Sequence, residues 1–132
     1  MTKILVAEDN PVNRELVREL LEIRGYIVFE ACNGQEALHM IAEALPDLLL
    51  LDLGMPVLDG FGVIRKIREN PSWANLPVLA VTAYAMHGDR DKIISSGFDG
   101  YLSKPINSAL LLKELAHLLK KTDGYEAINP SR

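Results

Sequence analysis

The stretch Leu48-Leu49-Leu50-Leu51-Asp52 is apolar at every position until it ends in a carboxylate. A strand that is continuously apolar, rather than alternating with polar residues, is typical of a parallel sheet covered by helices on both faces. Similar short runs lie on either side of it along the chain, at Lys3–Ala7, Tyr26–Ala31, Val78–Val81 and Gly100–Leu102. The sequence therefore predicts a sheet of buried parallel strands.

Segments with helical spacing separate these strands. The first has an apolar stripe between Pro11 and Arg24, made of Val12, Leu16, Leu20 and Ile23. Further helices are expected at about Gln35–Ala44, Phe61–Glu69, Arg90–Ser96 and Ser108–Lys121. This alternation of strand and helix predicts right-handed crossovers and one parallel sheet between two helical layers. Residues 122–132 lack periodicity, and we expect them to form a loose, flexible tail.

Composition and charge limit the classes of function. The chain has 132 residues, which fits one domain, and a net charge of -4, which disfavours nucleic acid and anionic membranes as partners. Its single cysteine, Cys32, excludes an internal disulfide and suits the reducing cytosol. The apolar run after Lys3 is too short for a signal peptide or a membrane span. A cytoplasmic domain that begins at Met1 is the expectation.

Ligands of an open parallel sheet bind beyond the carboxyl ends of its strands. The informative residues are therefore those that directly follow each apolar run. Glu8 and Asp9 follow the first run, Asp52 follows the third, Thr82 the fourth and Lys104 the fifth. The sequence thus predicts three carboxylates, a hydroxyl and an ammonium group at one rim of the sheet.

A cluster of three carboxylates needs a cation or a shared proton. Two carboxylates about 4 Å apart repel by about 4 kcal/mol at an effective dielectric constant of 20. Magnesium fits best, because it prefers oxygen ligands and keeps several waters. In-line phosphoryl transfer needs a nucleophile, a metal and fixed donors. Asp52 would be the nucleophile and Glu8 and Asp9 would hold the metal. Thr82 and Lys104 would pair with phosphoryl oxygens.

Each of these residues, taken singly, also has an ordinary structural explanation. A carboxylate or a threonine after a strand is often a helix N-cap, which would account for Asp52, for Glu8-Asp9 and for Thr82. Lys104-Pro105 would then be a turn with a solvated lysine. The common position of all of them at one rim favours the functional interpretation.

Four segments carry a family resemblance: Val6-Ala7-Glu8-Asp9-Asn10, Asp52-Leu53-Gly54-Met55-Pro56-Val57-Leu58-Asp59-Gly60, Val81-Thr82-Ala83 and Tyr101-Leu102-Ser103-Lys104-Pro105. In this order they resemble the CheY-like receiver domains of two-component response regulators. The resemblance covers about residues 3–121, and the Asp-x-x-Met-Pro-x-x-Asp-Gly run is its most distinctive part. It implies an α/β, flavodoxin-like (βα)5 doubly wound sandwich with strand order 2-1-3-4-5 over residues 1–121.

The resemblance also implies roles for single residues. Asp52 would accept phosphate from a phosphohistidine on a sensor kinase or a phosphotransfer protein. Glu8, Asp9, Asp52 and the backbone carbonyl of Gly54 would surround Mg2+. Thr82 and Lys104 would contact the phosphoryl group, and the Lys104-Pro105 peptide bond is expected to be cis.

Two further features of the family concern switching and phosphate lifetime. Thr82 would move toward the phosphoryl group and Tyr101 would turn inward, which changes the surface of the fourth helix, fifth strand and fifth helix. Gly54 and Tyr84 stand where the family tunes hydrolysis of the aspartyl phosphate. Because Gly54 cannot orient water and Tyr84 can shield the site, we expect a comparatively long-lived phosphoryl state.

The resemblance predicts a phosphorylation-activated signalling switch that catalyses only its own phosphotransfer and slow hydrolysis. It would pass its signal to a downstream protein target, as a monomer or a phosphorylation-dependent dimer. Leu110 falls off the apolar stripe of the last helix, so we expect it to be exposed and to contact a partner. The chain would be a free-standing regulator, a phosphorelay shuttle or a receiver module of a larger hybrid kinase. A flavin or nucleotide module is the alternative on this fold, but Glu8 and Asp9 would repel its phosphate. A haloacid-dehalogenase-like phosphatase would need Asp-x-Asp after the first strand, which is missing.

Overall fold

The computed structural model describes residues 1–83 and 87–128 and confirms the predicted alternation of strands and helices. The strands are β1 (Lys3–Ala7), β2 (Ile27–Ala31), β3 (Leu48–Asp52), β4 (Val78–Thr82) and β5 (Gly100–Ser103). The helices are α1 (Pro11–Ile23), α2 (Gly34–Ala44), α3 (Gly60–Glu69), α4 (His87–Ser95) and α5 (Ser108–Ile128). Most bounds lie within one residue of those predicted; α4 begins earlier than Arg90, and α5 ends later than Lys121.

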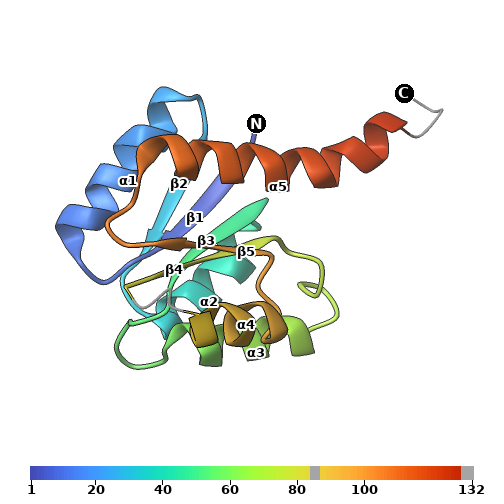
Figure 1. The fold of residues 1–132 in the computed structure, drawn as a ribbon. Helices are drawn as coiled ribbons and strands as arrows, with labels where there is room; N and C mark the ends of the chain where they lie inside the picture. Colours follow the sequence, from blue (N-terminus) through green and yellow to red (C-terminus); the bar gives the residue numbers. More distant parts are fainter. Residues whose placement is uncertain (84–86, 129–132) are drawn as a thin grey trace.

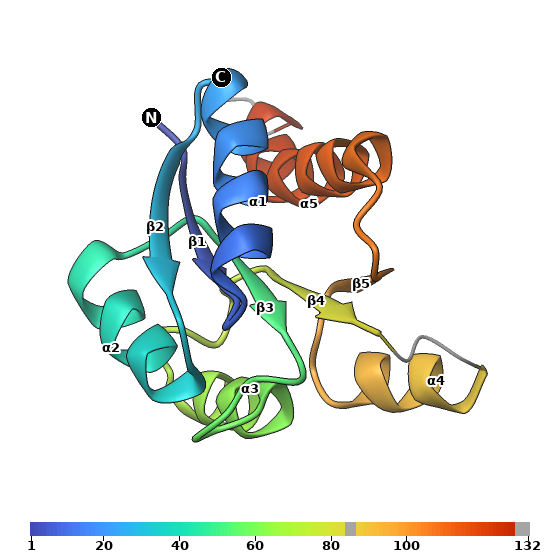
Figure 2. The same ribbon diagram turned by 90° about the vertical axis from the view of Figure 1, so that its left-hand side faces the viewer.

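The strands form one parallel sheet in the order β2-β1-β3-β4-β5, which confirms the flavodoxin-like fold. Helices α1 and α5 cover one face, and α2, α3 and α4 cover the other (Figure 1). All strands run in the same direction, so that the carboxyl ends of β1, β3 and β4 lie at one end of the sheet (Figure 2). The strand order reverses between β1 and β3, which is where this architecture places its ligand site.

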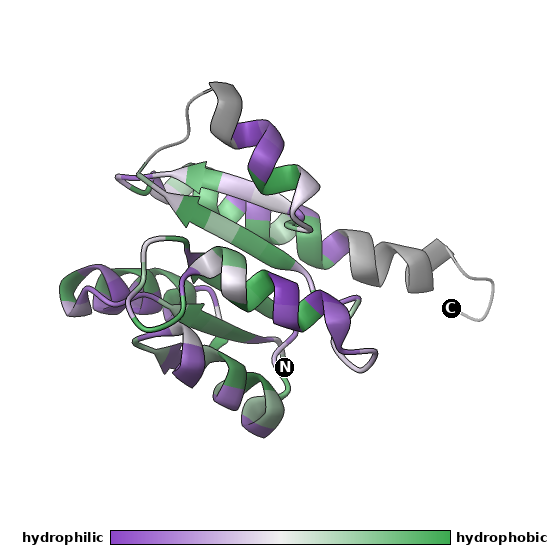
Figure 3. Cartoon of the chain, turned by 90° about the horizontal axis from the view of Figure 1, so that it is seen from below, coloured by the Kyte–Doolittle hydropathy of each residue, from purple (hydrophilic) through white to green (hydrophobic). Residues whose placement is uncertain are grey.

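The central strand β3 explains why its sequence is apolar at every position. Leu49 and Leu51 belong to the core beneath α2, α3 and α4, whereas Leu48 and Leu50 belong to the core beneath α1 and α5. Figure 3 shows that the strands are mainly hydrophobic, whereas the helices around them mix hydrophobic and hydrophilic residues. Because both faces of the sheet are covered, every side chain of Leu48–Leu51 is buried in one of the two cores. The strand therefore lacks the alternation of apolar and polar residues that a half-exposed strand has.

The predicted apolar stripe of α1 is not its buried face. Val17 and Leu21 face the core, whereas Val12, Leu16 and Ile23 are 72%, 54% and 81% exposed. The apolar side chains of α1 spread over about half of its circumference. Periodicity alone therefore could not predict which part of this wide face is buried. Packing against the sheet buries Val17 and Leu21 and leaves Val12, Leu16 and Ile23 as an apolar strip on the surface.

The last helix is longer than its sequence suggested. The prediction that it ends at Lys121 is wrong, because α5 continues to Ile128. The flexibility expected of residues 122–132 stays a prediction. This stretch includes the good helix formers Glu126 and Ala127, and the first proline stands only at Pro130. Leu110 is 51% exposed, as predicted. Within the described residues, none of the helices combines the length and apolarity needed to cross a membrane.

Candidate functional site

The predicted rim residues meet at the carboxyl ends of the strands. Glu8 follows β1, Asp52 and Thr82 are the last residues of β3 and β4, and Lys104 directly follows β5. Oxygen atoms of Glu8, Asp9 and Asp52 lie within 4.8 Å of one another. Glu8, Asp52 and Thr82 are buried, whereas Asp9 is exposed. The structure therefore assembles the acidic cluster that the sequence predicted.

Lys104 bridges the two buried carboxylates. Its Nζ lies 3.0 Å from Asp52 Oδ2 and 3.2 Å from Glu8 Oε1. The backbone amide of Lys104 donates to the carbonyl of Thr82 at 2.8 Å, which ties its loop to the end of β4. The Lys104-Pro105 peptide bond is cis, as predicted. One ammonium group thus offsets part of the negative charge of the cluster.

Asp52 is held as a carboxylate. Its Oδ1 accepts a hydrogen bond from the amide of Gly54 at 3.0 Å. Burial raises its pKa, but the hydrogen bonds from Glu8, the Gly54 amide and Lys104 outweigh burial and hold the pKa below its ordinary value. Burial lowers the pKa of Lys104, but its hydrogen bonds to Asp52 and Glu8 and their charges outweigh burial and raise the pKa above its ordinary value. Asp52 therefore presents an ionised oxygen next to a fixed ammonium group.

Glu8 has the opposite behaviour. Burial, together with its hydrogen bond to Asp52 and the charge of Asp52, raises the pKa of Glu8 from 4.5 to about 7. Near neutral pH and without a bound cation, Glu8 therefore carries a proton part of the time, while Asp52 stays ionised. A cation that binds here must displace this proton.

The raised pKa of Glu8 predicts a pH-dependent cost to stability. Between pH 4.5 and pH 7 the folded chain keeps a proton on Glu8 that the unfolded chain has released, so this group makes unfolding easier as the pH rises. A Glu8→Gln variant lacks this titration. Its advantage in free energy of unfolding over wild type, measured by urea denaturation without divalent cations, should grow by on the order of 2 kcal/mol across this range and then level off. A constant difference would contradict the shift.

The loop after β3 is shaped by the residues of the distinctive motif. Met55 is buried in the core, and Asp59 caps α3 by accepting from the Gly62 amide at 2.9 Å. A Cβ on Gly60 would meet the Cα of Leu53 at 2.8 Å, so only glycine fits there. Val57 has a φ of 71°, which is unusual for a β-branched residue. The motif thus fixes the turn that places the amide of Gly54 beside the Asp52 carboxylate.

A cavity of about 340 Å³ opens from the acidic cluster toward α3 and α4. Asp9, Asp52, Thr82 and Lys104 line one part of it, and Phe61, Lys92 and Ile93 line another. The Lys92 ammonium lies 4.7 Å from the centre of the Phe61 ring. Sequence reasoning missed Phe61 and Lys92, because a contact between two different helices leaves no local signal.

The predicted switch and tuning residues are only partly described. Tyr101 is partly buried on β5 and packs against the core beneath α4. Gly54 lies beside Asp52, as its position two residues later requires. Tyr84 lies outside the described residues.

Known proteins that resemble this chain agree with the function that this site suggests. Residues 4–116 match the family described as the response regulator receiver domain. The chain belongs to this family. It is 39% identical to the polar-differentiation response regulator DivK of Brucella anthropi, over 79% of this chain and 85% of that protein. It is 43% identical to the hybrid signal transduction histidine kinase I of Dictyostelium discoideum, over 98% of this chain but only 8% of the kinase.

A solved structure has the same fold. The receiver domain of the sensor histidine kinase PA1611 from Pseudomonas aeruginosa matches with a TM-score of 0.82 and 35% identity, over 89% of this chain and 97% of that one. That structure has a magnesium ion coordinated in its active-site cleft. The family and the fold are therefore those of two-component signalling.

Proposed function

We propose that this receiver domain accepts a phosphoryl group on Asp52 and acts as a phosphorylation-controlled switch. The observation that carries this proposal is the contact of Lys104 with both Asp52 and Glu8 at the mouth of a cavity. An ionised Asp52 oxygen with a fixed cation beside it is the arrangement that a nucleophilic carboxylate needs. The donor is a phosphohistidine on a sensor histidine kinase or a histidine phosphotransfer protein.

The acidic cluster suits Mg2+. Three carboxylates with oxygens within 4.8 Å of one another exceed the charge that Lys104 can offset, and hard oxygen ligands favour this ion. Glu8, Asp9, Asp52 and the backbone carbonyl of Gly54 would hold it. When bound, the ion would neutralise charge on the carboxylate and on the phosphoryl oxygens.

The chain's own residues define the transfer step. A carboxylate oxygen of Asp52 forms a bond to phosphorus while the phosphorus–nitrogen bond of the phosphohistidine breaks, and the bonding electron pair leaves with the imidazole. The ammonium group of Lys104 and the hydroxyl of Thr82 would then face the phosphoryl oxygens. This arrangement differs from a flavodoxin-like cofactor module, in which acidic side chains would not line the first loop.

An apolar surface next to the site suits a protein donor. A second cavity, of about 370 Å³, adjoins the site and is lined by Glu8 and Lys104. The rest of its lining consists mainly of apolar residues of α1 and of the loop before α5. Leu16 lines this cavity and is 54% exposed. A donor helix that covers this apolar strip would bring its histidine to the rim of the sheet.

Signal output would use the opposite side of the site. Thr82 and Tyr101 would rearrange after phosphorylation and change the surface of α4, β5 and α5, where Leu110 is exposed. The target is a downstream protein, bound by a monomer or a phosphorylation-dependent dimer. Gly54 and Tyr84 would give the aspartyl phosphate a long lifetime.

The chain would act in the cytoplasm and catalyse only its own phosphorylation and slow dephosphorylation. A second setting is a receiver module within a larger hybrid kinase. The likeness to part of the hybrid histidine kinase of Dictyostelium discoideum, which covers 98% of this chain, favours this setting. The chemistry at Asp52 would be the same in either case.

The test is the intact mass of the protein after incubation with Mg2+ and acetyl phosphate. We expect one added phosphoryl group in wild type, and no addition in an Asp52→Ala variant or when magnesium is removed by a chelator. Addition to the Asp52→Ala variant at the same level as wild type would overturn the assignment of the phosphoacceptor.

A further inference from the structure

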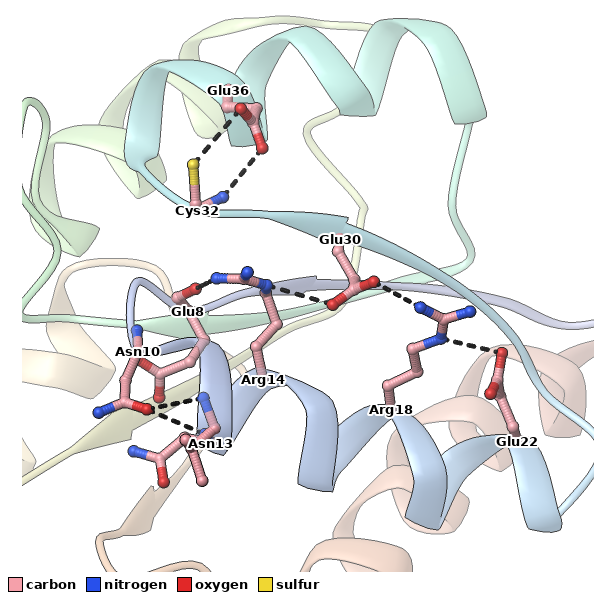
Figure 4. Close-up of polar contacts among 10 residues, drawn as sticks. Glu8, Asn10, Asn13, Arg14, Arg18, Glu22, Glu30, Cys32 and Glu36 are labelled. Carbon is pink, nitrogen blue, oxygen red and sulfur yellow. Dashed lines mark hydrogen bonds and ion pairs between the residues drawn. The ribbon is translucent and has the colours of Figure 1, made fainter.

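Arg14 connects the acidic site to the edge strand of the sheet. From α1, its Nη1 donates to the backbone carbonyl of Glu8 at 2.8 Å, and its Nε donates to Glu30 Oε1 on β2 at 3.1 Å (Figure 4). Its side chain is 21% exposed. The guanidinium group therefore lies between a predicted metal ligand and a carboxylate that takes no part in the site.

The backbone of Glu8 is held through both of its polar groups. Its amide donates to the carbonyl of Ala31 at 3.0 Å, and its carbonyl accepts from Arg14. Both anchors lead to the end of β2, since Ala31 adjoins Glu30. With the backbone of Glu8 anchored on both sides, the direction in which its side chain leaves the backbone is fixed, and Lys104 holds its carboxylate. Among the described residues, the next residue, Asp9, is anchored only through this turn and the Asn10 cap of α1.

Glu30 is itself held by two arginines. Its second oxygen accepts from Arg18 Nη1 at 2.9 Å, and Arg18 also contacts Glu22 at 3.2 Å (Figure 4). Within the part of the chain that the structure describes, Arg18 contacts neither Glu8 nor any other residue of the acidic cluster. Arg14 and Arg18 thus carry the same charge and both contact Glu30, but only Arg14 also donates to the Glu8 carbonyl. The planar fork of arginine suits this bridging role, which the single ammonium of lysine cannot reproduce in full.

We propose that Arg14 is a positioning residue for the acidic cluster. It fixes the turn after β1 so that the carboxylates of Glu8 and Asp9 keep the spacing that a divalent cation needs. This role depends on the magnesium site proposed above. Residues that orient metal ligands in this way typically change metal affinity by about 10-fold to 100-fold when they are replaced.

Electrostatics and positioning predict opposite results for the loss of Arg14. Removing a positive charge near three carboxylates should tighten the binding of Mg2+. Releasing the Glu8 carbonyl should weaken it, because the ligands then lose their fixed spacing. The sign of the change in the dissociation constant therefore distinguishes positioning from a simple charge effect.

The experiment is a titration of the whole chain with Mg2+ followed by 1H–15N NMR at the amides of Glu8, Asp9 and Gly54. We expect Arg14→Gln to raise the dissociation constant about tenfold. The control, Arg18→Gln, also removes one positive charge and one contact with Glu30, at its other oxygen, and it should bind Mg2+ as wild type does. Melting temperatures of both variants establish that a difference in binding is not a difference in folding.

Each other outcome has a defined meaning. An Arg14→Gln variant that binds Mg2+ as tightly as wild type, or more tightly, overturns the proposal. If that variant does not fold, Glu30→Gln decides, because it loosens Arg14 without touching Glu8; it should weaken binding in the same direction to a smaller extent, and an unchanged constant overturns the proposal. Wild-type amides that do not respond to Mg2+ would overturn the magnesium site itself, and Arg14's role with it.

Discussion

An Asp52→Asn variant should lose all phosphorylation and become more stable at the same time. Asparagine keeps the shape of the side chain, and its oxygen can still accept a hydrogen bond from the Gly54 amide. It has no ionised oxygen, however, to attack phosphorus. The charge of Asp52 also contributes to the raised pKa of Glu8. Removing it leaves Glu8 and Lys104 as a balanced pair, so we expect a gain on the order of 1 kcal/mol in the free energy of unfolding at pH 8 without Mg2+.

Intact mass after incubation with acetyl phosphate and urea denaturation measure the two effects. The matched control is Asp59→Asn, the same chemical change in the same loop. Asparagine can replace aspartate as the N-cap of α3, so this control should be phosphorylated normally. A phosphorylated Asp52→Asn variant would contradict the role of Asp52 as nucleophile. A loss of stability would instead show that the contact with Lys104 outweighs the repulsion between the carboxylates.

The strands and the rim of the site could be predicted because their signals are local. A run such as Leu48–Leu51 must be buried on both faces, and the residue that follows it must stand at the end of the sheet. Once parallel order is assumed, Glu8, Asp52 and Lys104 converge without knowledge of any contact between them. The resemblance then supplied what placement could not, such as the cis bond before Pro105.

The features that could not be predicted depend on contacts between distant segments. The buried face of α1 depends on how the helix packs against the sheet, and this packing buries Val17 and Leu21 and leaves Val12 and Leu16 exposed. The bond from Arg14 to the Glu8 carbonyl arises only when α1 packs beside β2. The left-handed backbone of Val57 likewise follows from closure of its loop, because nothing in a valine favours a positive φ.

A Lys104→Met variant should bind Mg2+ more tightly than wild type and yet be phosphorylated about 100-fold to 1,000-fold more slowly. Methionine keeps the length of the side chain and removes the charge that lies 3.0 Å from Asp52 and 3.2 Å from Glu8. Without this ammonium group the carboxylates attract a cation more strongly. The phosphoryl oxygens, however, lose a fixed donor whose charge is needed most when the new bond forms. Both quantities can be measured on the same samples, by NMR titration with Mg2+ and by the rate of mass increase with acetyl phosphate.

Lys113→Met is the control, since Lys113 is an exposed residue of α5 away from the acidic cluster, and we expect both quantities to stay at wild-type values. Lys104→Arg keeps the charge but not the compact ammonium, so it should retain near-normal Mg2+ affinity while phosphorylation stays slow. That pattern would separate the two contributions of Lys104: its charge sets the affinity for the cation, and its position sets the rate. If Lys104→Met were phosphorylated as fast as wild type, Lys104 would serve only to balance the buried carboxylates, and another donor would have to face the phosphoryl group.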